Sequence, residues 1–137
     1  MISEFAAAQV ATGGLGGILI LFFAMAIGHA IGDYPLQGEF LATGKNRNLD
    51  SNRFFGGEEV SPILWFHALT AHSLIQAGMV WIVAGSGALA LAELILHWII
   101  DFIRCEKWIG FTTDQAFHFG CKLIYAIILG LGVTMPF

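Results

Sequence analysis

Four apolar segments, each close to twenty residues long, dominate this sequence. We expect them to form helices at about residues 15–34, 62–83, 85–104 and 113–133. A helix of about 20 apolar residues is long enough to span the hydrocarbon core of a bilayer. Only 12% of the residues are charged and the mean hydropathy is +0.76, whereas soluble domains carry about 25% charged residues. The sequence therefore predicts an all-α membrane protein, one domain over residues 1–137 built as a four-transmembrane-helix bundle.

The basic residues of the connections set the expected orientation. All but one of the six Lys and Arg residues lie in the connections after the first and third segments. By the positive-inside rule these connections face the cytoplasm, so both termini lie outside it. The net charge of −4 and the lack of a basic patch exclude a nucleic-acid partner. Membrane lipid is the partner that this composition predicts.

Three of the apolar segments carry a histidine and an aspartate four residues apart. In chain order the pairs are His29 with Asp33, His97 with Asp101, and Asp114 with His118. Residues four apart share a helix face. The last pair is reversed in sequence, but so is the direction of its helix, so the aspartate lies nearer the cytoplasm in every pair. A charged side chain near the centre of a membrane helix costs roughly 2.5–3.5 kcal/mol, and such residues face inward. We therefore expect one polar core near the cytoplasmic side.

Each aspartate also has a simpler explanation. Asp33 could cap a short helix that starts near Pro35. Asp114 could stabilise the N-terminus of the fourth helix through the helix dipole. Asp101 could form an ion pair with Arg104. Three pairs at one depth favour a shared site over three unrelated roles.

The residue types of this core are those of a metal site. Imidazole and carboxylate groups are the usual ligands of zinc, manganese and iron, and inward carboxylates and histidines in a helical bundle are typical of di-metal proteins. The expected ligands of one or two divalent ions are His29, Asp33, His97, Asp101, Asp114 and His118. The residues expected around them are Gln37, His67, His72, Glu93, Gln115 and Lys122.

Two pairs in this outer group have further constraints. His67 and His72 are separated by about 140° around a helix, so they cannot both face one small centre. Glu93 and Lys122 lie deeper than the aspartates, and we expect Lys122 to neutralise Glu93.

Basic residues at the expected cytoplasmic helix ends extend the functional hypothesis. Lys45, Arg47, Arg104 and Lys107 would lie at headgroup height, where they suit phosphate groups. A bound metal could activate water, which favours a metal-dependent hydrolase of a lipid-like or phosphorylated substrate. Two alternatives stay open: a non-catalytic accessory subunit of a larger membrane complex, and transfer of protons or metal ions. Transfer is less favoured because the outer halves of the helices are nearly all apolar.

The polar motifs resemble those of an uncharacterised family of small bacterial and phage membrane proteins, a domain of unknown function. The similar stretches are "HAIGDYPLQ" with the later Lys45, "WFHAL", "LHWIIDFIR" and "DQAFH". The family pattern is H-x3-D-[FY]-x2-Q, a later Lys, a single His, H-x3-D and D-[QN]-x2-H. On this chain it covers His29, Asp33, Tyr34, Gln37, Lys45, His67, His97, Asp101, Asp114, Gln115 and His118.

This resemblance implies a multi-pass protein of the bacterial inner membrane and no established activity. It groups most of the candidate ligands into one set of motifs. His72, Glu93 and Lys122 lie outside the pattern.

The orientation can be tested with single cysteines. A cysteine placed at Asn48, in a connection expected to face the cytoplasm, should be protected from an impermeant thiol reagent added to the outside of the cells. A cysteine at Ser86, in the turn between the second and third segments, should react with it. The opposite labelling pattern would place the polar core near the outer surface.

Overall fold

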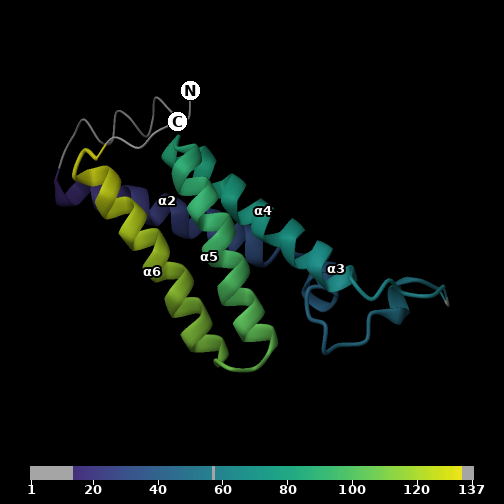
Figure 1. Ribbon diagram of the computed structural model, residues 1–137. Coiled ribbons are helices and arrows are strands. Elements are labelled where there is room, and N and C mark those ends of the chain that lie inside the picture. The colour runs from purple at the N-terminus through teal and green to yellow at the C-terminus, as the bar shows by residue number, and fades with distance from the viewer. Residues whose placement is uncertain (1–13, 57, 134–137) are drawn as a thin grey trace.

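The computed structural model describes residues 14–56 and 58–133, and this part of the chain is helical throughout, with no strand. Five α-helices and one short 3-10 helix follow one another (Figure 1). In chain order they are α2 (Leu15–Asp33), α3 (Gly38–Gly44), the 3-10 helix η1 (Asn52–Phe54), α4 (Leu64–Ala84), α5 (Gly87–Cys105) and α6 (Phe111–Gly130). The all-α prediction is therefore confirmed for the described residues.

The four long helices coincide with the four apolar segments, and every boundary lies within three residues of the predicted one. Around the bundle the neighbours follow the order α2, α4, α5, α6, and α6 packs again on α2. Figure 1 shows α5 and α6 side by side, joined by a short connection, with α2 passing behind them. Each long helix therefore presents one face to a common interior.

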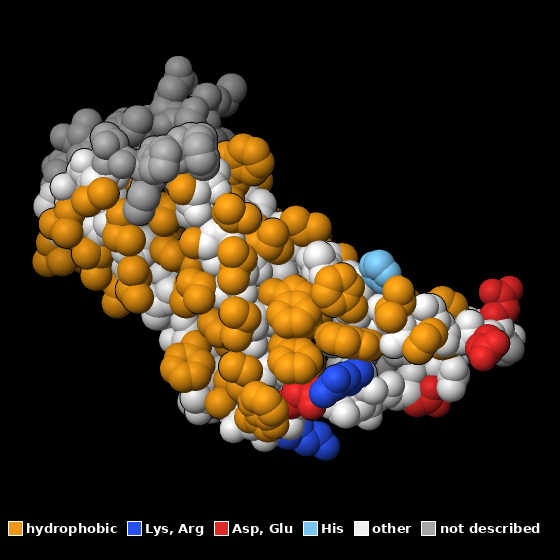
Figure 2. Space-filling model, viewed as in Figure 1, with side chains coloured by type: hydrophobic (Ala, Val, Ile, Leu, Met, Phe, Trp, Pro, Cys, Tyr) orange, Lys and Arg blue, Asp and Glu red, His pale blue; other side chains and the backbone are white. Residues whose placement is uncertain are grey.

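The distribution of polar and apolar side chains is inverted relative to a water-soluble protein. The largest side chains with less than 2% exposure include a lysine, a glutamate, a glutamine and four histidines. The outer faces are apolar, as on α5, where Leu91 and Ile95 are more than half exposed. Figure 2 shows apolar side chains over the helices on one face of the molecule, with charged side chains gathered toward the end that carries α3. Such a surface is typical of helices surrounded by lipid rather than water.

Two helices, α2 and α4, are long and apolar enough to cross a membrane. α5 and α6 are not among these candidates. Both carry buried charged residues, among them Glu93 and Asp101 on α5 and Asp114 and Lys122 on α6. The polar site itself thus lowers the apolar character of these two helices, and four membrane spans stay a prediction.

The end of the bundle away from α3 is packed with apolar side chains. Met25, Val80, Leu89 and Tyr125 form one buried cluster, with one residue from each long helix. Leu21 and Ala126 form a second buried pair between α2 and α6. The polar residues lie on the other side of this apolar layer along the helices, so the two halves of the bundle have different chemistry.

The long connection between α2 and α4 packs against the polar end of the bundle. Its helix α3 contacts α4, and Arg47 donates two hydrogen bonds, of 2.8 and 2.9 Å, to the Glu106 carboxylate after α5. These hydrogen bonds hold the pKa of the Glu106 carboxyl below its ordinary value. The guanidinium of Arg47 also lies 5.5 Å from the centre of the Trp65 ring. The connection is therefore fixed to both α4 and the end of α5.

Two local details differ from the expectations. α3 begins at Gly38 with Gln37 at its N-cap, and no side chain caps it; the expectation that Asp33 caps a helix near Pro35 is wrong. Ser86 caps α5 by accepting a hydrogen bond from the Leu89 backbone at 3.3 Å and is 5% exposed. A cysteine for labelling this turn is therefore better placed at Ala88, which is half-buried.

Candidate metal centre

Each of the four long helices contributes one buried histidine to the interior of the bundle. His29, His72, His97 and His118 are all 0–1% exposed. The rings of His97 and His118 stack with their centres 4.0 Å apart, and the rings of His72 and His97 lie 5.0 Å apart. The Nε2 atoms of His72 and His97 approach to 3.1 Å. Four imidazoles from four helices therefore form one connected cluster.

Asp33, in the last turn of α2, has polar neighbours on three helices. Gln76 on α4 donates a 2.6 Å hydrogen bond to its Oδ1 atom, and His72 Nε2 lies 3.4 Å from the same oxygen. Its Oδ2 atom lies 3.3 Å from His29 Nε2 and accepts a 3.3 Å hydrogen bond from Gln115 on α6. The carboxylate thus lies inside the cluster, held between α4 and α6.

Asp101, near the end of α5, lies between two groups of potential ligands. Its Oδ1 atom is 3.2 Å from His118 Nε2, and its Oδ2 atom is 3.4 Å from His72 Nε2. Lys45 donates a 2.6 Å hydrogen bond to Oδ2 and another of 2.6 Å to Gln37. Its ion-pair partner is therefore Lys45, and the alternative explanation, an ion pair with Arg104, is wrong.

Asp114 completes the outer layer of the cluster from α6. It lies in the first turn of that helix, as the helix-dipole explanation requires, yet its Oδ1 atom is 3.5 Å from His118 Nε2. Within residues 14–56 and 58–133, no hydrogen-bond donor reaches this buried oxygen. A buried carboxylate oxygen without a donor is unfavourable, and a cation would satisfy it.

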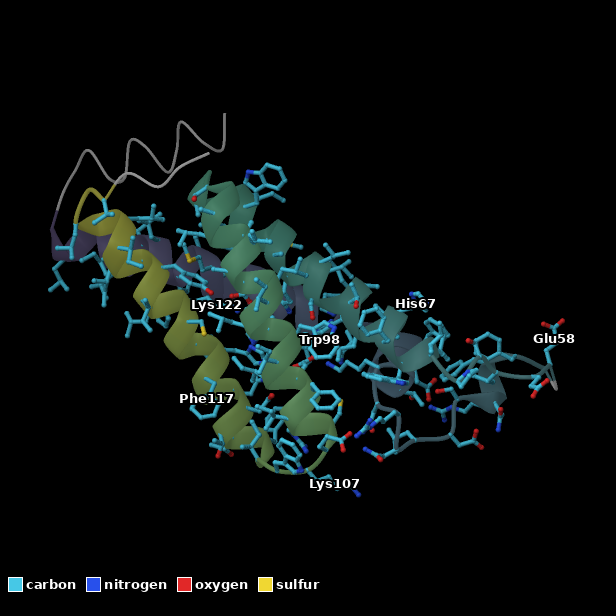
Figure 3. The ribbon with its side chains drawn as sticks, in the orientation of Figure 1. Glu58, His67, Trp98, Lys107, Phe117 and Lys122 are labelled. Atoms are coloured by element: carbon cyan, nitrogen blue, oxygen red, sulfur yellow. The ribbon has the colours of Figure 1, made fainter. Side chains whose placement is uncertain are left out.

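His97 is oriented by a deeper pair of charges. Lys122 on α6 donates a hydrogen bond to Glu93 Oε1, and the same oxygen lies 3.0 Å from His97 Nδ1. If Glu93 Oε1 accepts a hydrogen bond from His97 Nδ1 as well as from Lys122, the lone pair of a neutral His97 ring is on Nε2, which lies 3.1 Å from His72 Nε2. A carboxylate behind a histidine is the usual arrangement that orients a metal ligand. Figure 3 shows Lys122 between α6 and α5.

The cluster contains more negative than positive charge. Four carboxylates belong to it, those of Asp33, Glu93, Asp101 and Asp114. Two ammonium groups, of Lys45 and Lys122, bind these carboxylates. With neutral histidines two negative charges are left uncompensated, which is costly in a buried site and favours a bound cation.

The structure brings the six predicted ligands into one cluster, although His29 belongs to none of the groups of closely spaced ligand atoms, and it separates the two other histidines, which lie on α4. His72 lies in the cluster, whereas His67 is exposed on α4 (Figure 3). The start of α4 projects beyond the bundle and packs on α3, where Gly44 lies beside Ala68. His67 is therefore outside the polar layer that it was expected to support, and the reason is the position of α4 along the bundle.

The other predicted neighbours divide into two groups. Gln37, Gln115, Glu93 and Lys122 all hydrogen-bond to residues of the cluster. Among the basic residues, Lys45 and Arg104 line the same cavity as three of the aspartates. Arg47 is exposed and bound to Glu106, and Lys107 is exposed after α5.

Gln76 is a site residue that the sequence interpretation missed. It is fully buried, it donates to Asp33, and its amide oxygen is 3.3 Å from His29 Nδ1. The signal was present, because Gln76 follows His72 by four residues, the spacing of the three His/Asp pairs. A search for His/Asp pairs at this spacing overlooks a His/Gln pair.

Three groups of residues have ligand atoms within 4.8 Å of one another. They are Asp33 with His72 and His97; Glu93 with His97 and His118; and Asp101 with Asp114 and His118. The first and third groups suit a divalent ion each, because each offers both carboxylate oxygen and imidazole nitrogen. The second group is less suited, because Glu93 Oε1 already interacts with Lys122 and with His97 Nδ1.

The fold and the site thus define an all-helical protein with a buried His/Asp cluster that could hold metal ions. The family described as "Protein of unknown function (DUF3307)" matches residues 21–135. The chain belongs to that family, and the resemblance to an uncharacterised family is confirmed. No curated protein and no solved structure matches the chain.

The contact between Gly32 and Gln76 gives a test of the packing around Asp33. A Cβ atom at Gly32 would lie 2.5 Å from Gln76 Nε2, so Gly32→Ala should displace the amide from Asp33 and lower the free energy of unfolding by about 1–3 kcal/mol. The matched control is Gly120→Ala, since its Cβ would meet nothing within 4 Å. Thermal melting in detergent measures both. Equal melting temperatures for the two variants would contradict the proposed importance of the Gln76–Asp33 contact.

Proposed function

We propose that this chain is a multi-pass protein of the bacterial inner membrane with a di-metal site at the polar end of a four-helix bundle. One subsite consists of Asp33, His72 and His97, and the other of Asp114 and His118, with Asp101 shared between them. The polar end faces the cytoplasm, as the basic connections favour. The bound ions then serve a hydrolase that acts on a lipid-like or phosphorylated substrate.

The position of Asp101 is the observation that carries this proposal. Its Oδ1 atom lies 3.2 Å from His118 Nε2 and 3.8 Å from His97 Nε2, and its Oδ2 atom lies 3.4 Å from His72 Nε2, so the carboxylate borders both subsites. A carboxylate that offers one oxygen to each of two ions is suited to a pair of metals.

The spacing of nitrogen atoms supports the subsite on His72 and His97. Their Nε2 atoms are 3.1 Å apart. Two nitrogen ligands of a tetrahedral zinc ion lie about 3.3–3.4 Å apart, given bond lengths near 2.0–2.1 Å, so a shift of about 0.2–0.3 Å would bring these two atoms to that spacing. The hydrogen bond between His97 Nδ1 and Glu93 leaves His97 Nε2 available as the ligand atom.

The chemistry that such a site supports is hydrolysis. A divalent ion lowers the pKa of bound water and polarises a phosphoryl or carbonyl oxygen. In hydrolysis of a phosphomonoester, the water oxygen bonds to phosphorus, the ester P–O bond breaks, and the alcohol leaves with a proton. The buried carboxylates and imidazoles would hold the ions and accept the proton of the water.

Metal binding can be measured with a matched pair of histidine variants. Removing metal with EDTA should lower the melting temperature of the native protein, and a zinc or manganese concentration 100 times Kd should stabilise it by about 2.7 kcal/mol. The His97→Ala variant should lose most of the bound metal, because the substitution removes a ligand. Its melting temperature should therefore no longer change with EDTA or with added metal. His67→Ala changes an exposed histidine on α4 and should keep both. If the native protein contains no metal and its melting temperature does not change with EDTA, the proposed metal centre is contradicted.

Hydrolysis can be tested with the shared carboxylate. The native protein with Mn²⁺ should release inorganic phosphate from a phosphomonoester, and Asp101→Asn should reduce kcat at least about 100-fold because it removes charge from both subsites. The control Asp50→Asn makes the same change on an exposed residue of the connection and should retain activity. Full metal occupancy without release of phosphate from any phosphomonoester tried would contradict a phosphatase while leaving the metal site intact.

A second candidate function is that of an accessory subunit in a membrane complex. An apolar groove of about 520 Å³ lies between α4 and α5, lined by small residues such as Gly78 and Ala90 together with Trp81. Small residues let membrane helices approach closely. This reading is favoured if the protein contains no metal. Transfer of ions across the bundle is less favoured. The buried apolar cluster of Met25, Val80, Leu89 and Tyr125 lies between the polar cluster and the other end of the bundle, and an ion would have to cross it.

A further inference from the structure

A cavity of about 330 Å³ opens beside the aspartates at the polar end of the bundle. Its walls come from α2, α3, α5 and α6 and from the turn after α2. Asp33, Asp101 and Asp114 all border it. A molecule in this cavity would therefore lie directly against the outer ligands of the proposed metal site.

Two basic side chains line the same cavity. Lys45, at the end of α3, reaches Asp101 and Gln37 with its ammonium group. Arg104, in the last turn of α5, is half-buried. Within residues 14–56 and 58–133, no carboxylate lies within 4.0 Å of its guanidinium, whereas Arg47 and Arg53 each have an acidic partner. The cavity therefore combines two cationic side chains. Lys45 is paired with Asp101, a candidate metal ligand, and Arg104 is available to bind an anion.

We propose that Lys45 and Arg104 form a phosphate-binding subsite in this cavity, which selects a substrate with a terminal phosphate monoester. The inference rests on the proposed metal centre, since the phosphate would lie between these cations and the ions on Asp101. An arginine guanidinium pairs with two phosphate oxygens at once, and a lysine ammonium adds a point charge. Such a subsite would recognise the charge and the size of the phosphate group. It would not recognise the remainder of the substrate.

The ion pair between Lys45 and Asp101 would give Lys45 two roles. Lys45 would neutralise Asp101 when no ion is bound and would bind phosphate when an ion is bound. In the structure, the ammonium group of Lys45 lies 2.6 Å from Asp101 Oδ2 and compensates its charge. A divalent ion on Asp101 would repel this ammonium group, because the two cations cannot share one oxygen at low cost. The long lysine side chain then turns into the cavity, where it remains near Gln37 and can meet the phosphate. Metal binding thereby prepares the subsite for its substrate.

The surroundings of the cavity favour a lipid as the source of the phosphate. Tyr34 and Phe111 line the opening and are 68% and 58% exposed. The outer faces of α2 and α6 that lead away from it are apolar, with Ile27 and Phe117 exposed. The cavity holds a headgroup, and acyl chains would lie along these helix faces outside it.

Binding measurements on the full-length protein in detergent test the proposal. After loading with Mn²⁺ and a measurement of metal content, calorimetric titration with inorganic phosphate should show at least about tenfold weaker binding for Lys45→Met and for Arg104→Met. Lys45→Arg keeps the charge and should bind nearly as well as the native protein. Lys107→Met removes the same charge from an exposed residue outside the cavity and should bind as the native protein does.

Two further readouts separate the possible results. Lys45→Met should bind Mn²⁺ more tightly than the native protein, because it removes a competitor of the metal for Asp101. A short-chain phosphatidic acid should bind more tightly than inorganic phosphate if the source is a lipid, and equally if the source is soluble; phosphatidylcholine, whose phosphate is a diester, should bind weakly. Native metal content with unchanged phosphate affinity in both methionine variants would overturn the subsite alone. A native protein that binds no metal would overturn the proposed function, and the subsite with it.

Discussion

Compensation of buried charge is the constraint on which the rest of this structure depends. Charged groups inside an apolar bundle are tolerated only when each finds a partner. The Lys122–Glu93 pair links α6 to α5, and the Lys45–Asp101 pair links the connection to α5. Two carboxylates, of Asp33 and Asp114, have only hydrogen-bond donors or histidines around them. These polar contacts link all four long helices at one end of the bundle.

The same constraint explains why hydrogen bonds between helices are concentrated in one half of the bundle. Asp33 joins α2 to α4 through Gln76 and to α6 through Gln115. The other half relies on the packing of Met25, Val80 and their apolar neighbours. At the polar end, directional hydrogen bonds fix the relative positions of the helices. At the apolar end, the packing tolerates substitutions that conserve volume.

Much of the fold was predictable because the pattern of apolar residues reports directly on helix length. The four long helices and the shared faces of the His/Asp pairs follow from composition and from a spacing of four residues. The role of His72 rather than His67 was not predictable, since it depends on how far α4 projects toward α3. Lys45 was expected at headgroup height, but the fold of the connection brings it to Asp101. Contacts that depend on the path of a long connection are not encoded in local spacing.

The ion pair between α5 and α6 has a consequence for biosynthesis. Glu93 and Lys122 lie in the middle of their helices, and a lone charge at such a depth opposes entry into lipid by roughly 2.5–3.5 kcal/mol on the insertion scale. The two helices are joined by only a short connection, residues 106–110. If both helices span a membrane, as proposed, their charges could neutralise each other before either helix leaves the translocon. In the proposed four-span topology, α5 without α6 would be a poor substrate for insertion, and the two helices would enter the bilayer as one hairpin.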